Sequence, residues 1–148
     1  MDGMIGENEL EPVASPYRPD WVPRVGTTLR MVGVVFDAVR IVGEQGPAVA
    51  DVLGERTGHR AGPIVFQAIG EPRTYFLVPP GSVRRYRWSF PAEAFCRSDE
   101  RYSYVGVPSL QGDRRTWPLL WRSRPTEAAP FVDVNLLNTL IGSGPLAG

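Results

Sequence analysis

The stretch Pro63–Pro80, PIVFQAIGEPRTYFLVPP, constrains the fold more than any other part of this chain. It contains two runs rich in Val, Ile, Phe and Tyr, Ile64–Ile69 and Thr74–Val78, with Gly70 and Pro72 between them. Apolar and aromatic runs of this length, bounded by turn residues, are typical of a β-hairpin. The prolines that follow the second run end it, because proline lacks the N–H group that strand pairing needs. We therefore expect a hairpin within a larger sheet.

Three further segments have the composition of strands. Thr28–Phe36 is a dense apolar run with β-branched residues, and it predicts one buried strand with Asp37 at its end. Arg101–Val107 predicts a strand that stops at the proline after it. Thr116–Arg122 predicts a last strand, which Pro118 confines to the edge of a sheet.

Two segments have the apolar spacing of helices. Glu44–Arg56 predicts a short amphipathic helix, and Phe131–Ile141 predicts a helix that closes the domain. We expect Pro91–Glu100 to form a short helical turn or a loop. Ser82–Phe90 mixes arginines with aromatic residues, and its pattern predicts no single state.

The order of these elements predicts an α+β domain at residues 28–142 with one mostly antiparallel sheet. We expect a mobile, acidic and proline-rich arm at residues 1–27 and a short C-terminal tail at residues 143–148. The predicted core consists of Val34, Phe36, Val65, Phe66, Phe76, Val78 and Val105 in the sheet, covered by Val49, Leu53, Leu136 and Leu140.

Charge, cysteine content and hydropathy limit the partners and the compartment. The 148 residues carry no formal net charge, so nothing global indicates a nucleic-acid or membrane partner. The one cysteine, Cys96, excludes an intramolecular disulfide and a cysteine-based zinc site. No apolar run approaches the ~18 residues of a membrane span, and the acidic start lacks the pattern of a signal peptide. We expect a cytoplasmic protein without membrane contacts.

Few residues have the pattern of a catalytic or phosphate-binding motif. His59 is the only histidine, and no G-x-S-x-G elbow accompanies it, so a solvated loop residue is the simplest interpretation. The chain has no G-x-x-x-x-G-K-[ST] and no G-x-G-x-x-G motif, which excludes the common phosphate cradles. Cys96 stands beside Arg97 and is either a reactive thiol or a small filler of the core.

Arginine and aromatic residues are interspersed in the second half of the chain, and residues 84–124 carry nine arginines against four acids. The candidates for ligand binding are Arg84, Arg85, Arg87, Trp88, Arg114, Arg115 and Trp117. Arginine binds phosphates and tryptophan stacks on bases, so this composition suggests a site for single-stranded nucleic acid or a nucleotide. The alternative is an edge strand whose arginine stems cover core aromatics.

Three segments carry a series of motifs, VGVVFDAVRI, GEPRTYFLVPPG and YVGVPSLQGDRRTWPLLW. In this order and spacing, from Val32 to Trp121, they resemble the prim-pol domain of the archaeo-eukaryotic primase superfamily, also described as the bifunctional DNA primase/polymerase N-terminal domain. The resemblance implies an RRM-like, mostly antiparallel sheet with flanking helices, packed against a small α/β unit.

The resemblance also assigns site residues, and here the chain departs from the family. Active members hold divalent metals on two alternate acids and a later aspartate, while a histidine contacts the nucleotide phosphates. The first acid matches Asp37, and the second matches Val39, or Arg40 if the spacing shifts by one. The histidine matches Thr74. The later aspartate matches Cys96, with Asp99 and Glu100 close by. Two-metal chemistry needs several carboxylates around ions ~3.5–4 Å apart. A single remaining acid therefore predicts that polymerase chemistry has been lost.

Two classes of function stay open at this point. In the first, the domain is a catalytically degenerate prim-pol-like module that needs no cofactor and binds nucleic acid, a nucleotide or a protein partner. In the second, it is an active metal-dependent DNA primase/polymerase whose Mg²⁺ or Mn²⁺ is held by Asp37, Asp99 or Glu100. The low basicity of the chain and the missing histidine favour the first class.

Overall fold

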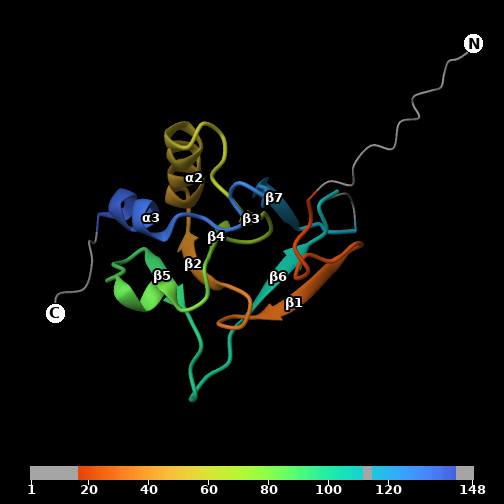
Figure 1. The fold of residues 1–148 in the computed structure, drawn as a ribbon, viewed down its shortest axis with the longest axis horizontal. Helices are drawn as coiled ribbons and strands as arrows, with labels where there is room; N and C mark the ends of the chain where they lie inside the picture. Colours follow the sequence, from red (N-terminus) through yellow and green to blue (C-terminus); the bar gives the residue numbers. More distant parts are fainter. Residues whose placement is uncertain (1–16, 112–114, 143–148) are drawn as a thin grey trace, which may run out of the picture.

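The computed structural model of the chain describes residues 17–111 and 115–142. Within these residues the fold is α+β, with two α-helices, a five-stranded sheet and a separate two-stranded sheet. All strand pairs in both sheets are antiparallel, which confirms the predicted class. Figure 1 shows the two helices together on one side of the molecule and the two-stranded sheet away from them.

The five-stranded sheet has the strand order β5-β2-β4-β3-β7. Its strands are β2 (Asp37–Val42), β3 (Ile64–Gln67), β4 (Arg73–Val78), β5 (Ala92–Phe95) and β7 (Leu119–Ser123). β3 and β4 form the predicted hairpin, with Ile64 opposite Phe76. β7 lies at the edge of the sheet, as the proline before it predicts.

The prediction of a single strand at Thr28–Phe36 is wrong. β1 (Thr27–Met31) ends early, the chain turns, and β2 begins at Asp37, so this aspartate starts a strand rather than ending one. The turn needs Gly33, whose φ of +92° is unfavourable for other residues. A Cβ on Gly33 would also lie 2.5 Å from the backbone nitrogen of Arg97. Backbone crowding therefore interrupts a run whose composition is that of a continuous strand.

β1 pairs with β6 (Tyr104–Pro108), and we call this two-stranded sheet the β-ribbon. The predicted strand at Arg101–Val107 therefore exists with shifted bounds, but it does not belong to the main sheet. The expectation of one sheet is wrong for this reason.

The segment Pro91–Glu100 contains β5 and is neither a helical turn nor only a loop. The residues AEAF have a low intrinsic preference for strands, and their pairing with β2 overrides that preference. Ser82–Phe90 begins with the single 3₁₀ turn η2 (Ser82–Arg85) and continues without regular structure.

Both predicted helices are present. α2 (Gln45–Arg56) and α3 (Val134–Ile141) begin within three residues of their predicted starts. The side chain of Asp133 caps α3 by accepting a hydrogen bond of 3.0 Å from the N–H of Leu136. α2 approaches the sheet closely at Gly46, where a Cβ would overlap the Thr74 hydroxyl.

The five-stranded sheet has an apolar core on each face. The helix-side core contains Val39, Ile41, Ala50, Leu53, Ala61, Ile64, Phe76, Val78, Val83, Ala92, Val132 and Leu137. The ribbon-side core contains Trp21, Val22, Val32, Phe36, Ala38, Val65, Leu77, Val105, Val107 and Leu110. Three residues of the predicted sheet core lie outside the five-stranded sheet: Val34 is 57% exposed in the turn after β1, Phe36 is buried in the same connection before β2, and Val105 is buried in the β-ribbon. Phe66 lies in β3 as predicted but is only half-buried.

The described end of the predicted N-terminal arm is part of the ribbon-side core. Val22 is fully buried, and the ring of Trp21 packs edge-on against Phe36 with 5.2 Å between centroids. Residues 1–16 and 143–148 lie outside the described residues. Neither helix in the described part of the chain is long and apolar enough to cross a bilayer.

Truncation of Phe76 tests the central position of the hairpin. Phe76 is fully buried, so Phe76→Ala is expected to lower the free energy of unfolding by about 3–5 kcal/mol. The matched control is Phe90→Ala, because Phe90 is 95% exposed and its truncation should cost less than about 0.5 kcal/mol. Chemical denaturation followed by tryptophan fluorescence measures both values, and equal costs would contradict this placement of β4.

Candidate functional site

Asp37, the first acid assigned by the resemblance, lies at the start of β2 and is fully buried. Its Oδ2 accepts a hydrogen bond of 3.3 Å from the N–H of Val83, and the N–H of Gly81 also contacts the carboxylate. Gly81 is the N-cap residue of η2 and Val83 is the second residue of η2, so Oδ2 caps the start of this turn, whereas Oδ1 is buried without a hydrogen-bond partner among the described residues. Burial raises the pKa of Asp37 above its ordinary value, while the two N–H groups and the nearby charge of Arg84 oppose the increase.

Arg84 of η2 connects Asp37 with the segment that follows β5. Its guanidinium donates a hydrogen bond of 2.5 Å to the carbonyl oxygen of Arg97, and the nearby side chain of Cys96 is the main cause that raises the pKa of Arg84. The charges of Asp37 and Asp99 lie close enough to raise the pKa of Arg84 further. We call this group the Arg84 corner; it comprises Asp37, Arg84, Cys96, Arg97 and Asp99.

The Arg84 corner brings together Asp37 and Cys96, which the resemblance matches to the acids of the family, and Arg84, which the sequence analysis named as a candidate for ligand binding. Ala38 pairs with Phe95, so Cys96 is the next position beside Asp37 on the antiparallel β2–β5 pair. The resemblance places the first acid and the later aspartate at these two positions. The charge of Arg84 interacts with both side chains.

Thr74, the position assigned to the histidine, does not belong to this corner. Asp37 pairs with Val78, which is four residues from Thr74 along β4, or about 13 Å at 3.3 Å per residue. Thr74 is fully buried under Gly46 of α2, and Val39, the position of the second acid, is fully buried in the helix-side core. Neither position is open to a ligand.

The acidic residues do not form a metal-binding group. Asp99 and Glu100 are exposed on the irregular segment after β5, whereas Asp37 is fully buried. Among the described residues, no three His, Cys, Asp or Glu side chains lie close enough together to hold a metal ion. His59 is exposed in the loop after α2, as its simplest interpretation predicts.

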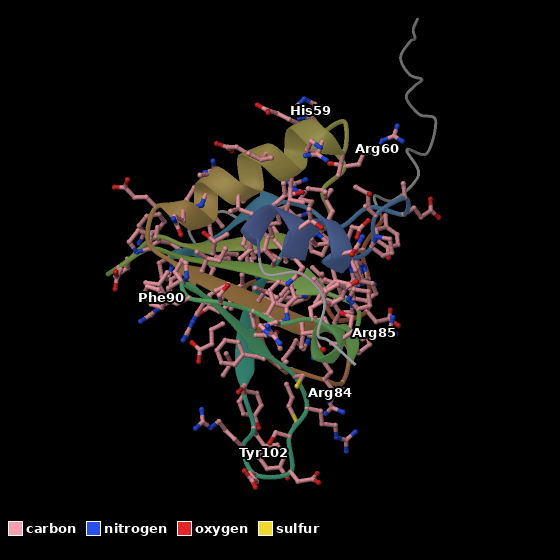
Figure 2. All side chains as sticks on the ribbon, turned by 90° about the vertical axis from the view of Figure 1, so that its left-hand side faces the viewer. His59, Arg60, Arg84, Arg85, Phe90 and Tyr102 are labelled. Carbon is pink, nitrogen blue, oxygen red and sulfur yellow. The ribbon has the colours of Figure 1, made fainter. Side chains whose placement is uncertain are left out.

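The predicted arginine and aromatic cluster is divided between two distant parts of the sheet. Arg84, Arg85 and Arg87 are exposed around η2, which follows the Val78 end of β4. Arg115 and Trp117 precede β7, whose first residues pair with the opposite end of the hairpin. Figure 2 shows Arg84 and Arg85 on one side of the molecule, below the helices. Arg114 lies outside the described residues.

Trp88 has a structural role in this arrangement. It is half-buried against the helix-side core, and its Nε1 donates a hydrogen bond of 3.0 Å to the carbonyl oxygen of Val83. The buried side chain of Asn138 donates a hydrogen bond of 2.8 Å to the carbonyl oxygen of Arg87. The segment that carries the arginines is thus tied to α3.

A second group of residues was not predicted from the sequence. A pocket of about 220 Å³ lies on the face of the sheet away from the helices, and we call it the sheet-face pocket. It is lined by Arg40, Tyr75, Phe95, Ser103, Tyr104 and Val105. The alternation of side chains along β4 could have shown that Tyr75 faces away from Thr74 and Phe76. The pairing of β2 with β5, which brings Phe95 to Arg40, has no signal in the sequence.

Comparisons with protein-family models, with curated proteins and with solved structures give no match for this chain. The resemblance to the prim-pol domain therefore stays an expectation that depends on three motifs.

The burial of Asp37 predicts a specific dependence of stability on pH. The pKa of Asp37 in the folded state is above its ordinary value of 3.8. At any pH between these two pKa values, the folded protein therefore binds more protons than the unfolded chain. The contribution of Asp37 to stability is thus complete below pH 3.8 and decreases as the pH rises through the raised pKa.

Asp37→Asn should remove this contribution. The difference in unfolding free energy between the natural chain and Asp37→Asn is expected to shift in favour of the variant as the pH rises from about 4 to 7. Urea denaturation at several pH values measures the difference. If the natural chain instead becomes more stable relative to Asp37→Asn as the pH rises over this range, the pKa of Asp37 is lowered and the prediction is wrong.

Proposed function

We propose that this chain is a prim-pol-like module that binds single-stranded nucleic acid or a nucleotide and does not transfer nucleotidyl groups. The chain order β2-α2-β3-β4-η2-β5 supports the RRM-like part of this proposal. It is the β-α-β-β-α-β order of the ferredoxin-like class, except that one 3₁₀ turn stands in place of the second helix.

The position of Arg84 carries the proposal. Its guanidinium interacts with Asp37, Cys96 and Asp99, which are the positions, or the neighbours of positions, that the resemblance assigns to metal ligands. A cation there opposes the binding of Mg²⁺ or Mn²⁺ by electrostatic repulsion. The same cation favours an anionic ligand such as a phosphate.

The neighbouring arginines extend this positive surface. Arg84, Arg85 and Arg87 are exposed, and neither of the ion pairs within the described residues involves them. Exposed arginines that are not held in an ion pair can contact phosphates, and such contacts release counterions and supply most of the affinity for a nucleic-acid backbone. We assign the phosphate contacts to this surface.

A protein partner is the second candidate, and one observation favours it. A groove of about 400 Å³ between α2 and α3 is lined mainly by apolar residues, and the 95% exposed ring of Phe90 stands at its border. Exposed apolar surface of this kind is common at protein interfaces. The alternative of an active primase/polymerase has no comparable support, because Asp37 is buried and caps η2.

The nucleic-acid proposal predicts weak, salt-dependent binding of single-stranded DNA. Fluorescence anisotropy with a labelled oligonucleotide should show an affinity that falls with log[salt], at a slope of about −0.7 per phosphate contact. Removing two contacts in the double variant Arg84→Ala/Arg85→Ala should make the slope shallower by about 1.4.

The matched control is Arg56→Ala/Arg60→Ala, which removes the same charge from exposed positions at the end of α2 and just after it. Figure 2 shows Arg60 at the far end of the molecule from Arg84 and Arg85. The control should leave the slope unchanged. If the natural chain gives no saturable signal at low salt, the nucleic-acid proposal fails and the protein-partner candidate is retained.

The proposal also predicts that divalent metals bind no better than they do to an isolated surface carboxylate, since hard cations need several oxygen ligands. Calorimetric titration with Mn²⁺ should show no saturable binding in the micromolar range, and EDTA should not change DNA affinity. Micromolar Mn²⁺ binding that disappears in Asp37→Asn would instead support the active enzyme.

A further inference from the structure

The sheet-face pocket combines aromatic rings with one arginine. Register places Arg40 of β2 directly opposite Tyr75 of β4 and Glu93 of β5, so the three side chains share one face of the sheet. Phe95 lies two residues beyond Glu93 and faces the same way. Tyr104 of the β-ribbon lines the pocket from the other side and is 54% exposed.

The charge of Arg40 is balanced inside this group. Its Nη2 lies 2.6 Å from Oε1 of Glu93, and its guanidinium carbon lies 5.0 Å from the centre of the Phe95 ring. Burial lowers the pKa of Arg40, but its hydrogen bonds to Glu93 and Tyr75 raise it, and the net shift is upward. An arginine whose positive charge is balanced by a paired carboxylate, and which is stacked on a ring, does not attract phosphate strongly. The pocket is therefore suited to a neutral, flat ligand.

Arg40 also has an unused hydrogen-bond donor. Its Nε is buried and has no hydrogen-bond partner among the described residues. A buried donor without a partner costs free energy, which a ligand with an acceptor atom would recover. The rings of Tyr75, Phe95 and Tyr104 add faces on which a flat ligand can stack. A nucleobase has both properties, a flat ring and acceptor atoms on its edge.

The pocket is connected to the Arg84 corner along the edge of the sheet. A neighbouring hollow of about 440 Å³ shares Phe95 and Ser103 with the pocket and is also lined by Cys96. Arg84 in turn donates a hydrogen bond to the carbonyl oxygen of Arg97, the residue after Cys96. A chain of nucleotides can follow this path with phosphates at the arginines and a base at the pocket.

From these observations we infer that the sheet-face pocket receives one base of a single-stranded nucleic acid, which stacks on Tyr104 and Phe95. The inference rests on the proposed function and adds a base-stacking site to the phosphate-binding surface. Such stacking tolerates any base, because every base has a π-face.

The test compares an oligothymidylate with an abasic oligonucleotide of the same length, which has the same phosphates and no bases. The natural chain should bind the oligothymidylate about 5- to 150-fold more tightly. Tyr104→Leu should bring this ratio close to one without changing the affinity for the abasic strand, and Phe95→Leu is a second variant with the same expectation.

The matched control is Tyr102→Leu, because Tyr102 is also exposed but lies at the tip of the loop between β5 and β6, outside the pocket lining. Figure 2 shows it at the far end of the molecule from the helices. This control should keep the natural ratio, and circular dichroism of each variant confirms its fold.

The outcomes separate the two proposals. Equal affinity of the natural chain for both strands overturns the base pocket and leaves the phosphate surface intact. A ratio that persists in both Tyr104→Leu and Phe95→Leu overturns the pocket as the site of stacking. Absence of binding to either strand overturns the proposed function, and the base pocket with it.

Discussion

One buried carboxylate holds together three parts of the chain that are distant in sequence. Asp37 of β2 accepts a hydrogen bond from the N–H of Val83 in η2, and Arg84 of η2 donates a hydrogen bond to the segment after β5. A buried charge is tolerated only where hydrogen bonds compensate for its lost hydration. The position of η2 is therefore set by Asp37, and the exposed arginines of η2 are held at a defined place beside the sheet. The residue that the resemblance assigns to a metal thus organises an arginine-rich surface.

The parts of the fold that could be predicted are those whose signal is local. The hairpin of β3 and β4 has turn residues between two β-rich runs, and α2 and α3 have helical spacing of apolar residues. β1 and β2 could not be separated, because the interruption depends on Gly33 approaching the backbone of Arg97, a contact between distant residues. β5 could not be recognised, because its pairing with β2 outweighs the weak strand preference of its own residues.

The candidate site was predictable only in part for a related reason. The motif order placed Asp37 and Cys96 at related positions, and the structure brings them together. Composition alone grouped Arg84 with Arg115, although the first follows β4 and the second precedes β7 on the far edge of the sheet. A count of charges contains no information on distance in space. The sheet-face pocket depends on three strand pairings at once, so no single stretch of sequence indicates it.

The β-ribbon has a consequence for the way the chain reaches its native state. Thr27 pairs with Pro108, so the ribbon closes a loop of about 80 residues, whereas the hairpin closes a turn of a few. Closing a longer loop costs more entropy, and folding slows as contacts become less local. During synthesis β1 leaves the ribosome well before its only partner strand. Until β6 has been synthesised, β1 has no strand to pair with, so the ribbon-side core cannot close. The helix-side core closes later still, because it needs Val132 and Leu137.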